Sequence, residues 1–154
     1  MKINWKKLIV ITVLTFVIGS IFSIFVMNSM DSFKALAKPI NVPGFIFPIV
    51  WSVLYLLMSI SYYLIDQSSN KGKENATKIY WIQLIINSLW TLIFFGLKAY
   101  LFAFIWLLLL LICVIIMISK FYNIDKRAAY LNIPYLLWII FAGYLNLGIY
   151  LLNR

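Results

Sequence analysis

Three sets of polar and aromatic residues recur at helical spacing inside long apolar stretches. Residues three, four, seven and eight apart share one face of a helix, and polar groups avoid lipid, so we expect each set to point inward. A hydrogen bond between helices would explain any one amide. Three faces that each join a large ring to an amide or hydroxyl indicate an apolar, aromatic-walled pocket for a flat, hydrophobic ligand. The sets are Trp51, Tyr55, Met58, Ser59 and Tyr62; Gln83, Asn87, Trp90 and Thr91; and Tyr135, Trp138, Ala142 and Asn146.

The residue inventory excludes several other kinds of chemistry. Histidine is absent, which excludes a Ser-His-Asp or Cys-His nucleophile, an imidazole proton shuttle and a histidine haem ligand. The single cysteine, Cys113, has no partner for an intramolecular disulfide or a cysteine metal cluster, and we interpret it as a small core residue. We therefore expect no metal site and no resident cofactor.

The elements that must position these residues are membrane-spanning helices. The chain has 154 residues, of which 65% are hydrophobic and 11% charged, whereas a soluble domain averages about 25% charged residues. Five charge-free runs, each long enough to cross a hydrocarbon core of ~30 Å as a helix, occupy residues 8–30, 39–65, 79–97, 99–119 and 128–153. The prediction is an all-α integral membrane protein, a single five-helix domain over residues 1–154 with spans near 8–27, 45–65, 79–97, 101–119 and 129–152.

No Asp, Glu, Lys or Arg lies within any run, which argues against an ion-coupled transporter or pump. The net charge of +9 fits basic residues that flank the spans and face lipid headgroups, so we expect no nucleic-acid partner. Basic residues are more frequent in the segments on the N-terminal side of the spans than on the other side, and this bias predicts a cytoplasmic N-terminus. The N-terminal side carries Lys2, Lys6, Lys7, Lys71, Lys73, Lys78, Lys120, Lys126 and Arg127; the other side carries Lys34, Lys38, Lys98 and Arg154.

The first loop, residues 28–44, mixes apolar and basic residues. Its apolar residues have roughly helical spacing, which predicts a short amphipathic helix that ends at Pro39 and packs on the mouth of the bundle, either as a lid or as an interfacial helix. At that rim, Lys34 and Lys38 could pair with carboxylates of a ligand or anchor the loop to headgroups. The apolar residues of the loop are Phe33, Leu36, Ala37 and Ile40.

In the last span, Pro134 lies several residues inside the run, where we expect a bend.

Three motifs occur in order and with consistent spacing. Residues 38–43 (KPINVP) lead to 47–55 (FPIVWSVLY), residues 83–90 (QLIINSLW) precede 94–96 (FFG), and residues 134–138 (PYLLW) precede 141–146 (FAGYLN). Together they resemble the tryptophan-rich sensory protein family, also called the translocator protein or peripheral benzodiazepine receptor family, over about residues 33–153. The chain is similar to the bacterial type of member.

This resemblance implies a five-helix bundle, usually a homodimer, in a bacterial cell membrane. In this family a cavity closed by the first loop binds porphyrins, sterols in animal members, and synthetic ligands such as isoquinoline carboxamides. Here the family's usual Trp-Tyr pair in that loop is Ser32-Phe33, and its Pro-Pro is Val42-Pro43. With the helical faces above, the resemblance implies a ligand site formed by Trp51, Tyr55, Asn87, Trp90, Tyr135, Trp138, Ala142 and Asn146.

Three functions compete on this evidence. The first is a membrane receptor or carrier for protoporphyrin-type tetrapyrroles. The second is light-dependent porphyrin degradation, in which Trp51 and Trp138, the tryptophans that the resemblance connects with porphyrin breakdown, would act as the catalytic residues through electron donation. The third is a small-molecule exporter, or a structural membrane protein without a ligand.

Overall fold

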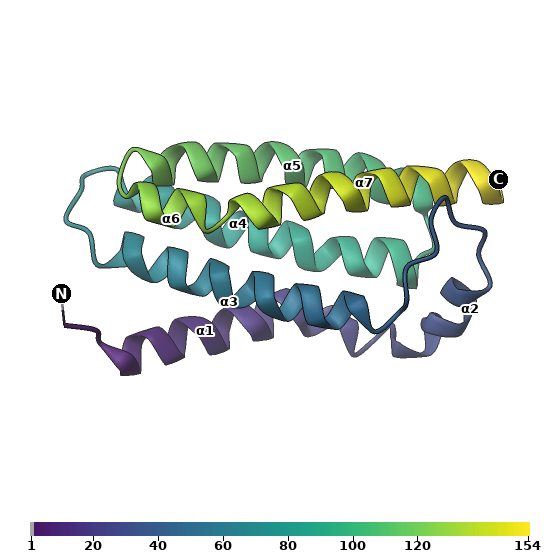
Figure 1. Ribbon diagram of the computed structural model, residues 1–154, viewed down its shortest axis with the longest axis horizontal. Helices are drawn as coiled ribbons and strands as arrows, with labels where there is room; N and C mark the ends of the chain where they lie inside the picture. The colour runs from purple at the N-terminus through teal and green to yellow at the C-terminus, as the bar shows by residue number, and fades with distance from the viewer. Residues whose placement is uncertain (1) are drawn as a thin grey trace.

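The structure, a computed structural model that describes residues 2–154, is a bundle of five helical spans that run alternately up and down (Figure 1). Five helices are long and apolar enough to cross a membrane, and no strand occurs within residues 2–154. The two termini lie at opposite ends of the bundle, as an odd number of spans requires. The prediction of an all-α, five-helix membrane protein is therefore confirmed. The spans are Trp5–Ser23, Ile46–Asp66, Lys73–Gly96, Tyr100–Tyr122 and Lys126–Asn153.

The first span tightens toward its end. Helix α1 (Trp5–Ser20) is capped at its N-terminus by Asn4, whose side chain accepts a hydrogen bond from the backbone N–H of Lys7 at 3.1 Å. It continues as the 3₁₀ turn η1 (Ile21–Ser23), and a second turn, η2 (Met27–Ser29), starts the first loop. The narrower turns of a 3₁₀ helix change the direction of the chain here, so the loop folds back over the end of the bundle.

The helix in the first loop is shorter than the sequence predicted. Helix α2 (Met30–Lys34) ends five residues before Pro39, and only Phe33 within it is buried. Leu36 is partly buried against the core, but Ile40 is 47% exposed, so the expected apolar stripe is not continuous. The prediction of an amphipathic helix that reaches Pro39 is therefore wrong, because the chain leaves the helix after Lys34.

The second and third spans are α3 (Ile46–Asp66) and α4 (Lys73–Thr91). Helix α4 continues as a π-helical segment, η3 (Leu92–Gly96), in which the N–H of Leu97 donates to the carbonyl of Leu92 at 2.9 Å. A π turn holds one more residue than an α turn and often occurs at functional sites. Lys98 then takes a positive φ of 52° and turns the chain into the fourth span.

The fourth span is α5 (Tyr100–Tyr122), and the fifth is divided into α6 (Lys126–Tyr130) and α7 (Ile133–Asn153). The expected bend at Pro134 is therefore wrong: the helix is broken at Leu131–Asn132, and Pro134 lies in the first turn of α7, where its missing N–H costs no hydrogen bond. The Ala128 carbonyl, released at this break, accepts hydrogen bonds from Ser61 Oγ at 2.7 Å and Asn132 Nδ2 at 3.0 Å. Such partners satisfy the backbone inside a membrane.

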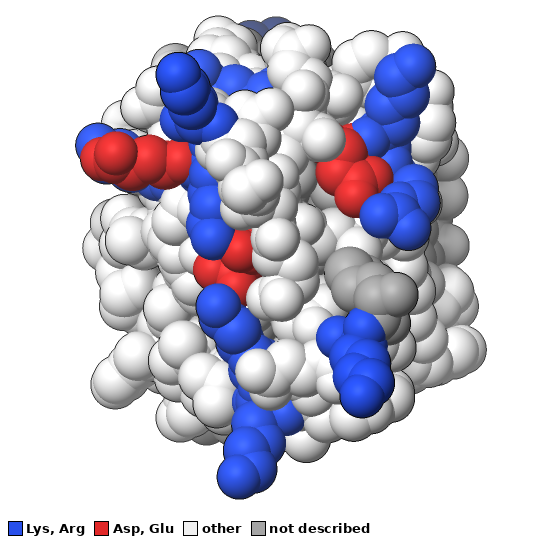
Figure 2. Space-filling model, turned by 90° about the vertical axis from the view of Figure 1, so that its left-hand side faces the viewer, with Lys and Arg blue, Asp and Glu red and all other residues white. Residues whose placement is uncertain are grey.

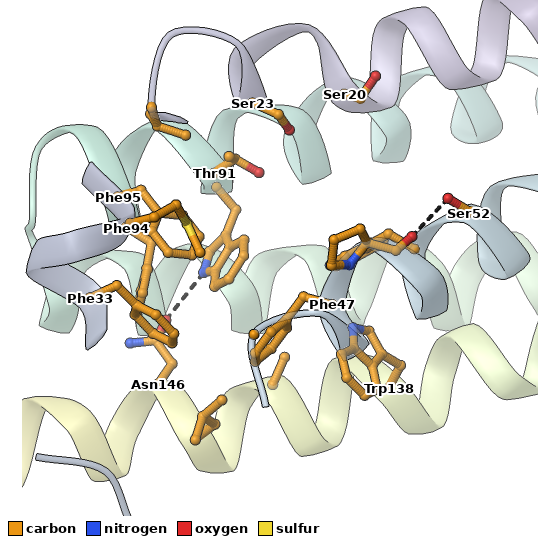
Figure 3. Close-up of a pocket in the computed structure, with 18 of the residues that line it drawn as sticks. Ser20, Ser23, Phe33, Phe47, Ser52, Thr91, Phe94, Phe95, Trp138 and Asn146 are labelled. Carbon is orange, nitrogen blue, oxygen red and sulfur yellow. Dashed lines mark hydrogen bonds between the residues drawn. The ribbon is translucent and has the colours of Figure 1, made fainter. Parts of the chain in front are cut away.

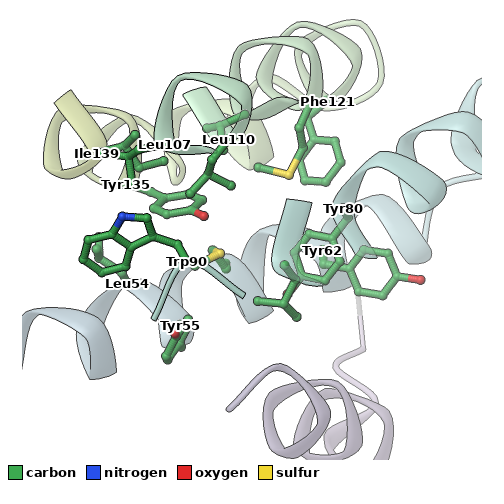
Figure 4. Packing of buried hydrophobic residues seen from close by; sticks show 14 of the residues in the cluster. Leu54, Tyr55, Tyr62, Tyr80, Trp90, Leu107, Leu110, Phe121, Tyr135 and Ile139 are labelled. Atoms are coloured by element: carbon green, nitrogen blue, oxygen red, sulfur yellow. The ribbon is translucent and has the colours of Figure 1, made fainter. Parts of the chain in front are cut away.

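The buried core extends along the bundle, and many of its fully buried side chains lie in the half nearer the N-terminus. Tyr80 is fully buried there, stacks on Tyr62 with ring centroids 4.5 Å apart, and shares a hydrogen bond of 2.7 Å with Thr15 (Figure 4). In this half α3 packs against α4 and α6, and α1 packs against α3 and α4. Toward the other end, aromatic rings make the contacts between α3 and α7, and a cavity lies among these two helices, the first span and the end of α4.

Charged side chains gather at the end of the bundle that carries the N-terminus (Figure 2). Asp66, at the end of α3, pairs with Lys7 of α1 and with Lys73 of α4, and so joins three helices. Asp125 caps α6 and pairs with Arg127 at 2.8 Å, and this partner holds the pKa of the Asp125 carboxyl below its usual value. This is the end at which the sequence places nine of the thirteen basic residues.

Candidate functional site

A cavity of about 500 Å³ lies among the first span, α3, the end of α4 and α7. Figure 3 shows Phe33, Phe94 and Phe95 clustered at one end and Trp138 at the other. None of the described residues that line it is charged, and its polar groups are a few hydroxyls, one amide and the indole nitrogens. The lining residues include Phe16, Ser20, Ser23, Phe33, Phe47, Trp51, Tyr55, Trp90, Thr91, Phe94, Phe95, Trp138, Phe141, Ala142 and Asn146.

Six of the eight candidate ligand-binding residues line this cavity, and the other two lie behind its wall. Asn87 is 2% exposed, and its Nδ2 donates to the Tyr55 hydroxyl at 3.3 Å. Tyr135 is fully buried, and its hydroxyl donates to Oε1 of Gln83 at 2.8 Å. These two residues support the wall. The six that line the cavity are Trp51, Tyr55, Trp90, Trp138, Ala142 and Asn146.

Most polar groups of the wall are bonded to the protein itself. The indole N–H of Trp90 donates to Oδ1 of Asn146 at 3.1 Å, and Nδ2 of Asn146 donates to the Tyr100 carbonyl at 2.8 Å. The Tyr55 hydroxyl donates to the Gly19 carbonyl at 2.9 Å. At Gly19 a Cβ would lie 2.6 Å from the Tyr55 ring, so only glycine permits this approach. Because these groups are already paired within the protein, the wall presents mainly apolar surface to the cavity.

The indole of Trp138 is an exception to this pairing. Its ring meets Trp51 edge to face with centroids 6.5 Å apart, and Phe47 lies 6.0 Å away on another side. The Trp138 Nε1 atom is buried, yet it has no hydrogen-bond partner among residues 2–154. An unpaired buried donor costs about 1–3 kcal/mol.

Phe33 of the first loop forms the end wall of the cavity. It is 6% exposed and packs against Phe47, Phe94 and Phe95, with ring centroids 6.1, 6.0 and 5.3 Å away. The π-helical segment η3 supplies both Phe94 and Phe95, adjacent residues that would point in different directions on a regular helix.

The two lysines proposed for the rim do not line the cavity. Lys38 Nζ donates to the carbonyls of Leu36 at 3.1 Å and Lys34 at 3.3 Å, and it lies 4.7 Å from the Phe33 ring centroid. Lys34 itself is exposed and lies 3.8 Å from the carboxylate of Asp31. Lys38 is therefore engaged with its own loop.

The end of the first span was not part of the candidate site, although it forms one wall. The serines there are spaced for one helical face, and with Phe16 they contribute to the lining. A pair of hydroxyls in an otherwise apolar run is the signal that could have identified them. The exposed lining residues are Ser23, Met27, Gly44, Pro48 and Ser52, so the mouth of the cavity opens between the end of the first span and the start of α3.

Comparison with known proteins gives one consistent result. The sequence profile of the TspO/MBR family matches residues 9–152. The tryptophan-rich protein TspO of Archaeoglobus fulgidus is 34% identical over 152 residues, which cover 97% of this chain and 99% of that protein. Protein CrtK of Rhodobacter capsulatus is 35% identical over 127 residues (79% and 78%), and the translocator protein of Homo sapiens is 31% identical over 118 residues (74% and 70%). The chain is a multi-pass integral membrane protein and belongs to the TspO/MBR family.

Proposed function

We propose that this protein is a membrane receptor or carrier that binds porphyrins of the protoporphyrin IX type, and synthetic benzodiazepine-receptor ligands, in the aromatic cavity. The observation that carries the proposal is the wall itself: the rings of Phe47, Trp51, Trp90 and Trp138 border one uncharged space of about 500 Å³. Aromatic walls with few donors suit a flat, hydrophobic molecule. Names such as translocator protein and tryptophan-rich sensory protein among the relatives agree with a ligand-handling role.

An uncharged wall also limits how a porphyrin would bind. Burying bare carboxylates without a partner is prohibitive, so the two propionates must stay outside the apolar space. The macrocycle therefore enters edge first and leaves its carboxylates at the mouth, beside Ser23 and Ser52, or near the first loop. In this proposal the Trp138 N–H, which has no acceptor among residues 2–154, turns to donate to the ligand.

The test is a titration of the purified protein with protoporphyrin IX in the dark, followed by light. Binding in the dark, with no loss of the porphyrin spectrum after illumination, supports the receptor or carrier. The absence of binding in the dark overturns it. The control is Trp51→Ala with Trp138→Ala, which removes both facing indoles from the wall.

The second candidate is light-dependent oxidative degradation of the porphyrin. It is favoured by the juxtaposition of Trp51 and Trp138, two easily oxidised rings with centroids 6.5 Å apart at the cavity wall. In this scheme light excites the bound porphyrin, an indole donates one electron to it, and the porphyrin passes that electron to dioxygen. The reduced dioxygen adds to the macrocycle, which returns an electron to the indole cation, so the porphyrin is oxidised and dioxygen is reduced overall. Light-dependent loss of the porphyrin spectrum that needs dioxygen and both indoles would support it.

The remaining proposals concern the assembly and its orientation. We expect a homodimer in a bacterial cell membrane, with the basic end in the cytoplasm because positive charge concentrates there. Light scattering of the detergent-solubilised protein measures the oligomeric state. Labelling of single cysteines placed at Lys71 or Lys98, in a Cys113→Ala background, determines which end is accessible from outside intact cells.

A further inference from the structure

The first loop is fastened to the end of α7 by a reciprocal pair of hydrogen bonds. The N–H of Ala37 donates to Oδ1 of Asn153 at 3.0 Å, and Nδ2 of Asn153 donates to the carbonyl of Ala37 at 2.8 Å. The same Nδ2 donates to the Ile149 carbonyl one helical turn earlier, at 2.7 Å. The amide is thus oriented by its own helix and satisfies both backbone groups of one loop residue.

A second contact lies one turn further back along α7. A Cβ built at Gly148 would lie 2.4 Å from Cγ of Pro39 and 2.9 Å from its Cβ, distances that real side chains do not adopt. Glycine is an unfavourable residue inside a helix, and here its missing side chain is the space that Pro39 fills. We define Ala37 and Pro39 of the loop with Gly148 and Asn153 of α7 as the latch.

The latch lies close to the ring that closes the cavity. Phe33 precedes Ala37 by four residues and is held by three other phenylalanines. Between Ala37 and Pro39, the ammonium of Lys38 lies over the Phe33 ring at 4.7 Å. The segment from Phe33 to Pro39 is therefore fixed at both ends, by the aromatic cluster at one and by α7 at the other.

We infer that Asn153 and Gly148 are positioning residues: they hold the first loop on α7, keep Phe33 in the cavity wall and so set how fast a ligand leaves. The effect on a ligand rests on the proposed function. The latch itself is formed by contacts within the chain, so the two parts can be tested separately.

The first experiment measures hydrogen–deuterium exchange of residues 33–39 in lipid nanodiscs without ligand. Asn153→Ala removes both hydrogen bonds to Ala37, and Gly148→Ala displaces Pro39, so both variants are expected to exchange about three- to tenfold faster in this segment, the range that one hydrogen bond of ordinary strength gives. The matched control is Gly143→Ala on the same helix, where a Cβ meets Leu107 at an ordinary 3.5 Å. We expect exchange in the loop of this control to equal that of the wild type.

Gly148→Ala also separates the latch from a general role in helix stability. Alanine favours a helix over glycine, so a residue that only supported α7 would leave the loop unchanged or more protected. The latch predicts the opposite result, faster exchange in the loop while α7 stays protected. Asn153 is exposed, and Asn153→Ala provides a second variant whose folding does not depend on close packing.

The second experiment measures the dissociation rate of dark-bound protoporphyrin IX by competition. Both latch variants are expected to release it about three- to tenfold faster, with Gly143→Ala unchanged. Unchanged loop exchange in Asn153→Ala and Gly148→Ala would overturn the latch. Faster exchange with unchanged dissociation would overturn its role at the cavity. A wild type that binds no porphyrin would overturn the proposed function and the role in ligand release, while the exchange result would still decide on the latch.

Discussion

The rings of Trp51 and Trp138 meet edge to face across the gap between α3 and α7, with centroids 6.5 Å apart and planes at 89°. Replacing either by phenylalanine keeps an aromatic surface and removes the N–H and the easily oxidised ring. We expect porphyrin affinity to fall by about 1 kcal/mol, roughly fivefold, and any photodegradation to fall much further. Equal losses of binding and degradation would leave these residues a packing role only.

Ala142 lines the cavity on its α7 side, so a larger side chain there narrows the space left for a ligand. Ala142→Thr adds a methyl and a hydroxyl there, and a typical overpacking cost is about 1–3 kcal/mol. We expect lower thermal stability in detergent and weaker ligand binding. Ala35→Thr, at an exposed position of the first loop, is the control. Unchanged stability and affinity of Ala142→Thr would contradict this placement.

The side chain of Asn146 bridges the Trp90 N–H and the Tyr100 carbonyl. Asn146→Ala removes the partner of the buried Trp90 N–H and one of the hydrogen bonds that the Tyr100 carbonyl, at the start of α5, accepts, and an unpaired buried group costs about 1–3 kcal/mol. A clear fall in the unfolding temperature is expected. Asn87→Ala is the comparison, since the Tyr55 hydroxyl keeps its bond to the Gly19 carbonyl and the loss is smaller. Equal unfolding temperatures of the two variants would show that the hydrogen bonds of Asn146 stabilise the protein no more than the single bond of Asn87 does.

Replacing the two lysines of the first loop tests whether they pair with ligand carboxylates or maintain the conformation of the loop. Lys38 bonds to two carbonyls of its own loop, so Lys34→Gln with Lys38→Gln is expected to weaken protoporphyrin IX and an uncharged isoquinoline carboxamide by the same factor, about two- to fivefold. Titrations of both ligands at low and high salt measure this. A loss confined to the porphyrin, and mirrored by salt in the wild type, would instead show that the lysines pair with its carboxylates.

The pair of Asp125 and Arg127 at the start of α6 makes the stability of the folded protein depend on pH in the acid range. Hydrogen bonds from Arg127 lower the pKa of Asp125 in the folded state, so the folded protein favours the carboxylate. This contribution is present above the unfolded pKa of about 3.9 and is lost as the pH falls through the folded value. Asp125→Asn is expected to flatten thermal stability between pH 5 and pH 3, roughly the range around that pKa. A wild type and variant with parallel pH profiles would contradict the assignment.

Much of the architecture could be predicted from the sequence, because charge is excluded from the hydrocarbon core and the five runs are visible directly. The break at Leu131–Asn132 could not, since a proline inside an apolar run is compatible with either a bend or a new helix start. The π turn at Leu92–Gly96 has no sequence rule of its own. The packing of Phe94 and Phe95, two residues of this segment, on Phe33 appears only in three dimensions.

The candidate site was predicted in part for a similar reason. Helical spacing indicates which side of a helix faces inward, but not which inward residues reach an open space. Asn87 and Tyr135 share faces with Trp90 and Trp138, yet they lie deeper and bond to Tyr55 and Gln83. The contribution of the first span escaped prediction because Ser20 and Ser23 lie among apolar residues that resemble a plain membrane anchor.

The internal pairing of Trp90, Asn146 and Tyr55 has a consequence for selectivity. A site rejects a near-isostere strongly only when its own polar groups would be left without a partner, whereas an apolar slot separates molecules weakly. In this cavity most hydrogen-bond donors are paired with groups of the protein itself. Discrimination between ligands therefore depends on their thickness and shape. If the proposed function is right, we expect chemically unrelated planar molecules to compete for this one cavity, because its wall and not a single contact sets what it binds.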